Sequence, residues 1–437
     1  MNQILPIVRV PRRSFAAEAA GVRDKVRVSA ETHGLVSDIV ADIKKRGDAA
    51  LLEYSQRFDG VELQKNKLRV EDSEIDEAFD SVGPELVTAL RFSLRRIRKV
   101  QLALFPRARR SIRSEGFTVV ARSRPLPSVG CYAPGGRAAY ASTVLMTAGV
   151  AKFAGVPRVV LTSPPQRDGK VSPAVLAAAK VAGVDEVYRV GGAQAISALA
   201  YGTESLSRVA KIVGPGGVHV SVAKRLVAAD VETDFYAGPT ELIVFADEYC
   251  PPRFPAWDLI GQAEHGGDTL CGLVTYSEEY ADEVRAEILE LLPTLERREH
   301  VEASLERGFS AVCDSESTAC GFIDAVAPEH LEILTRDYLR VGERVERAGL
   351  KLLGAYSPCA ASDYVAGTDH VIPTAGFSAC RGALSVLDFL KLDWSVSGTE
   401  AGLRGVIQPL KALAYAEGLP NHYLTTRSRF EELRRPK

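Results

Sequence analysis

Residues 128–136 read SVGCYAPGG, residues 186–194 read EVYRVGGAQ, and residues 209–217 read VAKIVGPGG. Each stretch joins a short apolar run, which is typical of a buried β-strand, to glycines that favour a tight turn. The first two turns lead into segments of helical length at residues 142–153 and 193–201. Because strands that alternate with helices pair through βαβ crossovers, this pattern predicts a largely parallel sheet.

The same alternation continues in the second half of the chain. The predicted elements are strands at 241–246 and 270–276, helices at 255–265 and 278–292, a strand near Ala311, a helix at 315–325 and a further pair within 337–353. The first hundred residues and the tail after Leu384 are predicted to be mostly helical. We therefore expect an α/β protein with two similar Rossmann-like, parallel-sheet domains, a helical N-terminal segment and a small helical C-terminal element.

The composition is that of an ordinary globular protein. The chain has 437 residues, 46% of them hydrophobic and 25% charged, and a formal net charge of −2, so we expect two or more domains. No run approaches the ~20 apolar residues of a bilayer-spanning helix, and residues 1–13 lack the apolar core of a secretory signal. The seven cysteines are scattered and none forms a C-x-x-C pair, which is typical of a reduced compartment. These features predict a cytoplasmic protein with no membrane partner.

An arginine-rich stretch over residues 91–113 is the feature that would suggest nucleic-acid binding, because clustered cations bind phosphates. Leu86, Leu90, Leu94 and Ile97 recur there at helical spacing, so the arginines fit the solvated face of an amphipathic helix. No aromatic platform or known binding motif accompanies them. The sequence therefore favours the solvated face and predicts no nucleic-acid partner.

The three glycine turns bear on nucleotide binding. None matches G-x-G-x-x-G, and no acidic residue stands at the expected place ~20 residues further on. Each turn singly is explained as an ordinary βα connection. Three of them in one predicted domain favour a nucleotide crevice, because glycines let the backbone approach phosphates.

Short polar segments in the second half carry the candidate catalytic groups. Four of the seven histidines lie in them beside carboxylates: His265, His330, His370 and His422. Each histidine singly is more often an ordinary surface or core residue. Jointly, imidazole, amide and carboxylate donors without a thiolate favour a site for zinc or a related divalent ion. The adjacent Glu329 and His330 offer two bases with different ordinary pKa values, which suits a reaction with two proton removals.

In these segments the chain resembles the histidinol dehydrogenase family, and the resemblance covers nearly its full length. The motifs that carry it are SVGCYAPGG at 128–136, VGGAQA at 190–195, AGPTE at 237–241, QAEH at 262–265, APEH at 327–330 and GTDHVIPT at 367–374. The resemblance implies a zinc- and NAD-dependent dehydrogenase. Its reaction would be the four-electron oxidation of L-histidinol through L-histidinal to L-histidine, the last step of histidine biosynthesis.

The resemblance also implies roles for single residues. The implied ligands of one zinc ion per subunit are Gln262, His265, Asp363 and His422, and the implied acid–base pair is Glu329 and His330. The implied substrate contacts are Thr240, His370 and Glu417, together with His330 and the four metal ligands. The implied NAD contacts are Tyr132, Gln194 and Gly217.

The family forms homodimers in which the C-terminal element is exchanged, so Glu417 and His422 are expected to complete the partner's site. The implied domains are an N-terminal segment (1–22), a substrate and zinc domain (23–131 and 240–384), an inserted NAD domain (132–239) and the C-terminal element (385–437).

The chain departs from the family pattern at several site positions. Gly217 and Asp369 stand where the family has Asn, Thr240 stands for Ser, and Cys359 stands for Glu. We expect Cys359 to be catalytically inert. Because these changes bear on the substrate pocket, one alternative is a paralogue that oxidises another polar primary alcohol, such as 2,3-dihydroxypropane-1-sulfonate. The other is a zinc hydrolase with a Glu general base, which would not need the glycine-turn domain.

Overall fold

The computed structural model describes residues 4–25, 28–106, 108–135 and 139–432, and the chain divides into two compact units. The first unit comprises Met1–Leu104 and Leu126–Phe389, and the second comprises Phe105–Pro125 and Leu390–Lys437. Gly136, which belongs to the first predicted glycine turn, lies outside the described residues. In the described part of the chain, no helix is both long and apolar enough to span a bilayer.

The first unit contains a six-stranded parallel sheet with the strand order β1-β11-β10-β9-β12-β13. Its strands are β1 (Ile7–Val10), β9 (Glu241–Ala246), β10 (Leu270–Thr275), β11 (Phe309–Cys313), β12 (His330–Leu334) and β13 (Leu350–Leu353). The helices on its faces are α1 (Phe15–Asp24), α11 (Arg253–Ala263), α12 (Glu278–Leu291), α13 (Arg298–Arg307) and α14 (Glu316–Val326).

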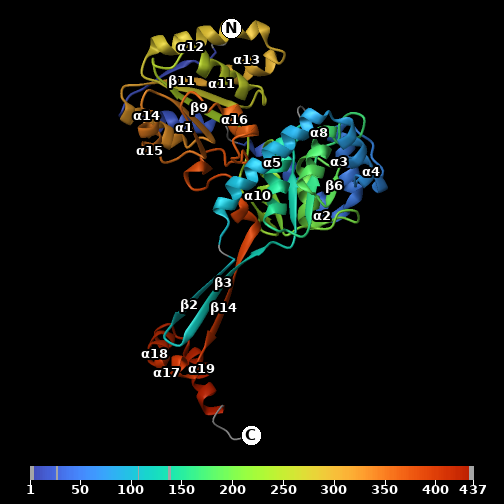
Figure 1. The fold of residues 1–437 in the computed structure, drawn as a ribbon, viewed down its shortest axis with the longest axis vertical. Coiled ribbons are helices and arrows are strands. Elements are labelled where there is room, and N and C mark those ends of the chain that lie inside the picture. Colours follow the sequence, from blue (N-terminus) through green and yellow to red (C-terminus); the bar gives the residue numbers. More distant parts are fainter. Residues whose placement is uncertain (1–3, 26–27, 107, 136–138, 433–437) are drawn as a thin grey trace. The chain divides into compact units, whose positions relative to one another are not determined.

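The central strand β9 is buried on both faces. Leu242 and Val244 pack in one cluster with α11, α12 and α13, whereas Ile243 and Phe245 pack in another with α1 and α14. Figure 1 shows these two helix layers on opposite sides of the sheet. This two-sided burial explains why the strand reads as a continuous apolar run in the sequence.

A second parallel sheet in the same unit has the order β6-β5-β4-β7-β8. Its strands are β4 (Val129–Tyr132), β5 (Val159–Thr162), β6 (Glu186–Tyr188), β7 (Lys211–Val213) and β8 (Glu232–Thr233). The chain runs outward from β4 through β5 to β6 and then returns to the other side of β4 as β7. The carboxyl ends of β4 and β7 therefore flank a topological switch point, where sheets of this kind bind ligands.

Helices α2 (Ala30–Arg46) and α3 (Asp48–Asp59) share a hydrophobic cluster with strands of the second sheet. Val36 and Ile39 pack there with Val160 and Ile212, and with α9 (Gly192–Tyr201) and α10 (Val218–Val227). This packing associates α2 and α3 with the second sheet rather than with the first. The domain boundaries expected from the sequence remain a proposal.

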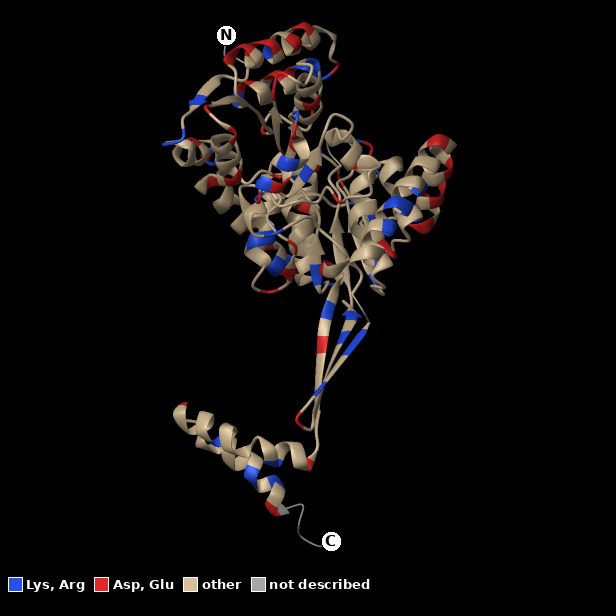
Figure 2. Cartoon of the chain, turned by 60° about the vertical axis from the view of Figure 1, so that its left-hand side comes forward, with Lys and Arg blue, Asp and Glu red and all other residues tan. Residues whose placement is uncertain are grey.

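The arginine-rich stretch lies mostly on α5 (Pro84–Leu104), which buries Leu90, Leu94 and Ile97 and exposes its arginines. This confirms the amphipathic helix expected for that part of the stretch. Basic and acidic residues are both spread along the described chain (Figure 2).

The second unit contains a three-stranded antiparallel sheet, ordered β14-β3-β2, and three helices. Its elements are β2 (Arg109–Ser114), β3 (Phe117–Pro125), β14 (Leu390–Gly398), α17 (Glu400–Gly405), α18 (Ile407–Ala416) and α19 (Pro420–Glu432). The helical tail agrees with the expectation, but these strands and β1 were not predicted. All six residues of β2 are exposed, so the strand lacks the apolar alternation that would predict it.

The helix expected at 142–153 consists of α6 (Ala141–Val144), one π-helical turn (Leu145–Gly149) and α7 (Val150–Phe153). The remaining helices are α4 (Asp72–Ser81), α8 (Pro173–Ala182), α15 (Tyr338–Arg344) and α16 (Cys359–Tyr364). Four 3₁₀ turns span Lys65–Lys67, Leu292–Thr294, Phe377–Ala379 and Val386–Phe389 in the described chain.

Candidate active site

A cavity of about 190 Å³ in the first unit collects most of the predicted site residues. Its walls come from the loops after β4 and β7 in the second sheet, and from residues that precede or begin β9 and β12 in the first sheet. The predicted residues that line it are Gly217, Thr240, Gln262, His265, Glu329, His330, Asp363 and His370. The glycine turns and the polar segments, which are far apart in the sequence, thus meet at one place.

Glu329 is held by two hydrogen bonds at the start of β12. Its Oε2 accepts from Thr240 Oγ1 at 2.6 Å and from the Glu241 backbone N–H at 2.8 Å. Gln262 Nε2 donates in turn to Thr240 Oγ1 at 2.7 Å. The carboxylate is therefore fixed in position by its own protein surroundings.

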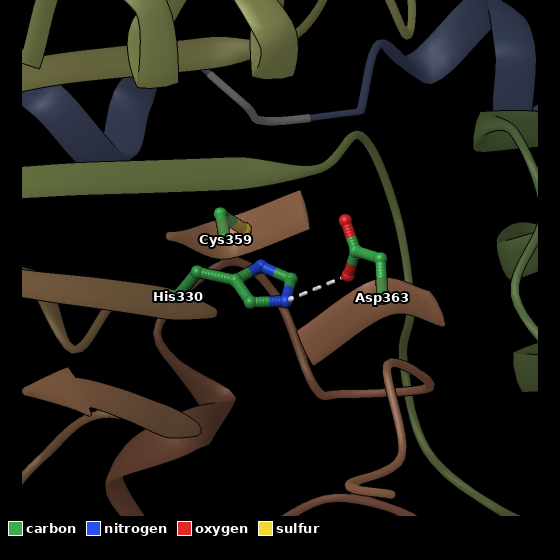
Figure 3. Close-up of side chains that lie close together, drawn as sticks. All are labelled: His330, Cys359 and Asp363. Carbon is green, nitrogen blue, oxygen red and sulfur yellow. Dashed lines mark ion pairs between the residues drawn. The ribbon is translucent and has the colours of Figure 1, made fainter. Parts of the chain in front are cut away.

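His330 is the first residue of β12, and its ring is buried. Nδ1 lies 3.3 Å from the Glu241 carbonyl oxygen and 3.5 Å from Glu329 Oε2. Nε2 lies 3.8 Å from Asp363 Oδ1 and has no hydrogen-bond partner among the described residues (Figure 3). Burial lowers the pKa of His330, but the carboxylates of Glu329 and Asp363 outweigh burial and raise it to about 9. Because Nδ1 is hydrogen-bonded to the Glu241 carbonyl oxygen, the ring can exchange a proton through Nε2.

Gln262, His265 and Asp363 present three potential metal-binding groups to the cavity. The bond from Gln262 Nε2 to Thr240 leaves the amide oxygen on the opposite side, where it accepts from Cys359 Sγ at 3.6 Å. The surrounding protein desolvates the His265 ring and lowers its pKa, which favours the neutral form that binds metals. Burial raises the pKa of Asp363 to about 6, so a nearby cation would stabilise its ionised form.

These donors fit a divalent ion. In the described part of the chain, potential ligand atoms of His330, Cys359 and Asp363 lie within 4.8 Å of one another. This group shares only Asp363 with the predicted ligand set, although Gln262 and His265 line the same cavity. An amide oxygen, imidazoles and a carboxylate are ligands that zinc and related ions accept.

The remaining predicted residues do not line this cavity. Glu417 and His422 lie in the second unit, where both are exposed. Tyr132 and Gln194 are buried near the turn between β6 and α9, where the Gly192 N–H donates to the Tyr132 hydroxyl at 3.1 Å. Burial raises the pKa of Tyr132 to about 12, so its hydroxyl stays protonated.

Two buried side chains to which the sequence assigned no role, Glu241 and Thr143, form hydrogen bonds with residues of the site. Glu241 accepts from the Glu329 backbone N–H at 3.1 Å and from the Ala375 N–H at 2.7 Å, and burial raises its pKa to about 8. Thr143 places its Oγ1 2.9 Å from His370 Nε2. A carboxylate at the start of an otherwise apolar strand was the sequence signal for Glu241, because charged residues are rarely buried without partners.

The family model described as histidinol dehydrogenase matches residues 22–430. The chain belongs to the histidinol dehydrogenase family. The histidinol dehydrogenases of Methanosarcina mazei and Rhodospirillum rubrum are each 42% identical to it, over 92% and 95% of both chains respectively. The crystal structure of histidinol dehydrogenase from Elizabethkingia anophelis matches with a TM-score of 0.91 at 31% identity and covers 99% of each chain.

Membership of the histidinol dehydrogenase family confirms the resemblance inferred from the motifs, together with the α/β fold. Since the chain belongs to a family of dehydrogenases, the zinc-hydrolase alternative is excluded. The cavity is the candidate site for substrate and cofactor.

Proposed function

We propose that this protein oxidises L-histidinol through L-histidinal to L-histidine and passes two hydrides to NAD. The observation that carries the proposal is the cavity in which Glu329 and His330 meet three of the four expected metal ligands and a glycine turn. One alcohol and one water would yield one carboxylate, two reduced cofactors and three protons. Two bases in one cavity suit such a reaction, because each oxidation needs its own proton acceptor.

The groups that the family implies can be assigned to residues of this chain. Gln262, His265, Asp363 and His422 are the proposed ligands of one zinc ion per subunit, and Tyr132, Gln194 and Gly217 are the proposed NAD contacts. When bound, the ion supplies a fixed positive charge and NAD supplies the hydride acceptor. A Cβ added to Gly217 would meet no atom within 4 Å, which leaves room for a cofactor beside the carboxyl end of β7.

His330 is the proposed acceptor of the alcohol's hydroxyl proton, at Nε2. Glu329 and Asp363 are the two carboxylates that raise the pKa of His330. A cation bound to Asp363 would offset the charge of that carboxylate and so favour the neutral form of His330, which can accept a proton. A positioned base of this kind contributes ~10²–10⁴-fold to the rate.

Glu329 is the proposed base for the second oxidation, in which it takes a proton from the water that adds to the aldehyde. The hydrogen bonds from Thr240 and Glu241 fix Oε2, and no described residue donates to Oε1. Oε1 is therefore the atom that we propose to face the water.

Thr240, His370 and Glu417 are the further proposed substrate contacts. Burial, and then the neighbouring charges of His330 and His265, lower the pKa of His370 to about 3. His370 is therefore neutral, and its bond to Thr143 holds one ring nitrogen in place. A neutral ring of fixed orientation suits the recognition of a polar substrate group.

A homodimer, in which Glu417 and His422 complete the partner's site, is part of the proposal. An apolar row on the second unit supports it: Ile112, Leu392, Trp394 and Val396 are 59–65% exposed. Ile112 and Val396 both lie opposite Val119 in the sheet, so they share one face with Leu392 and Trp394. Exposed apolar rows of this kind are typical of protein interfaces.

A cytoplasmic location is also proposed. All seven cysteines are free, and six of them are buried. Unpaired cysteines are usual in reducing compartments.

The test is an NAD-reduction assay with zinc present that compares L-histidinol with 2,3-dihydroxypropane-1-sulfonate. We expect two NAD molecules reduced per histidinol and histidine as the product. Turnover of the sulfonate alone, or one cofactor reduced per substrate, would contradict the proposal.

A further inference from the structure

Cys359 lies in the candidate metal cluster with His330 and Asp363. It begins the helix α16, and Asp363 follows four residues later on the same helix face. The close-up in Figure 3 shows both side chains beside the His330 ring. Their potential ligand atoms and one nitrogen of His330 all lie within 4.8 Å of one another.

A second observation points to a ligand at this place. His330 Nε2 is buried, faces Asp363 and has no hydrogen-bond partner in the described part of the chain. Buried polar atoms are rarely left without a partner in folded proteins. The Cys359 thiol for its part donates to the amide oxygen of Gln262 at 3.6 Å, so sulfur and that oxygen lie close to one another.

We infer that Cys359 supplies a thiolate ligand to the divalent ion that Asp363 holds. This inference rests on the metal site of the proposed function. In the binding step the S–H bond breaks, its proton passes to the solvent and a sulfur–metal bond forms, with no change of oxidation state. Cys359 then acts as a ligand and not as a nucleophile.

The thiolate distinguishes this site from one built only of nitrogen and oxygen donors. Thiolates favour zinc and cobalt over manganese and magnesium, because the softer ions bind sulfur more strongly. Through Cys359 the site therefore selects zinc-like ions.

The experiment uses the full chain, freed of metal and reloaded with cobalt(II), without substrate or NAD. We expect the thiolate-to-cobalt charge-transfer absorption in the wild type and its loss in Cys359→Ser. Cobalt affinity should fall roughly tenfold or more in that variant, and manganese affinity should change much less. Cys313→Ser, which alters another buried cysteine, is the matched control and should keep the absorption.

Wild-type protein that binds cobalt without this absorption would overturn the inference, as would an absorption that persists in Cys359→Ser. The wild-type spectrum is decisive even if the variant does not fold. Since no substrate is present, the result does not depend on whether the protein oxidises histidinol. If the protein shows the cobalt–thiolate absorption but does not oxidise histidinol, the proposed reaction is rejected and the thiolate ligand is retained.

Discussion

At the residue scale, two of the imidazoles that line the cavity differ in charge at neutral pH: His330 is protonated and His370 is neutral. His330 lies within 4 Å of the carboxylates of Glu329 and Asp363, which raise its pKa to about 9. His370 is also buried, and His330 and His265 add repulsion, so its pKa falls to about 3. The two rings differ because the carboxylate charges outweigh burial at His330, whereas burial dominates at His370 and the charge of His330 adds to it.

Glu329→Gln should separate the two oxidations. The amide can still accept the bonds from Thr240 and the Glu241 N–H, but it cannot take a proton from water. We expect conversion of added histidinal to fall by ~10²–10⁴-fold. The alcohol step should be less affected, because the loss of one carboxylate lowers the pKa of His330 and favours its neutral form.

The measurement is NAD reduction in single turnovers that start from the alcohol or from the aldehyde. Thr240→Ser is the control, since it keeps the hydroxyl that donates to Glu329. Normal aldehyde oxidation by Glu329→Gln would reject its role as the base.

At the scale of elements, the glycine turn after β7 brings two strand ends together. Gly214 has φ +121°, and a Cβ there would lie 2.2 Å from the Tyr132 carbonyl oxygen at the end of β4. A side chain at this position would push the carboxyl ends of β4 and β7 apart. The sequence predicted a turn here, but only the packed strands show how closely Gly214 approaches the end of β4.

Gly214→Ala should therefore destabilise the protein by about 3 kcal/mol or more, through backbone strain and a steric clash. Gly217→Ala in the same turn is the matched control: its φ is −59° and its Cα faces open space. We expect that control to change stability by less than about 1 kcal/mol. The free energies of unfolding come from urea titrations, and equal losses in both variants would contradict this account.

The end of α3 holds a carboxylate in an unfavourable place. Asp59 Oδ2 is buried without a partner among the described residues, and burial raises its pKa to about 6. Asp59 is also the last residue of α3, where the negative end of the helix dipole disfavours a carboxylate. Because the folded pKa lies above the ordinary value of ~3.9, the stability present at low pH is lost as the pH rises through about 6.

Asp59→Asn should raise the free energy of unfolding by about 1 kcal/mol near pH 8, a value reduced for partial solvent screening. The gain should shrink as the pH falls below about 6 and vanish near about pH 4, where the carboxyl is protonated in both the native and the unfolded state. Asp38→Asn, at an exposed site on α2, should show no such pH-dependent gain. A gain that does not vary with pH would point to another cause.

At the scale of the whole molecule, two parallel sheets supply opposite ends of their strands to one cavity. The second sheet contributes loops at the carboxyl ends of β4 and β7, as expected for its strand order. The first sheet contributes the amino ends of β9 and β12. The rule that ligands bind at the carboxyl ends of parallel strands does not predict this contribution. The second unit carries its own antiparallel sheet with an exposed apolar row.

Val396→Lys should weaken self-association if that row is the dimer interface, because it would bury a charge in an apolar contact. We expect the dimer dissociation constant to rise roughly tenfold or more, as measured by analytical ultracentrifugation. Leu289→Lys, at a 53% exposed apolar position on α12, is the control. An unchanged dissociation constant in Val396→Lys would exclude this face.

The sequence by itself determined what depends on neighbouring residues. The apolar runs and glycine turns predicted most strands and helices of the first unit, because local burial patterns and backbone freedom decide those elements. The pair Glu329 and His330 was visible because the two residues are neighbours in the sequence. Strands with exposed side chains, such as β2, left no such pattern.

Only the tertiary structure decided which distant groups meet. The order of the strands brings the end of α11, the start of β12 and α16 to one cavity, and it places Cys359 and Asp363 beside His330. The charge states of His330 and His370 follow from those contacts. Strand order and electrostatic environment depend on residues far apart in the chain, and a single sequence carries no local signal for them.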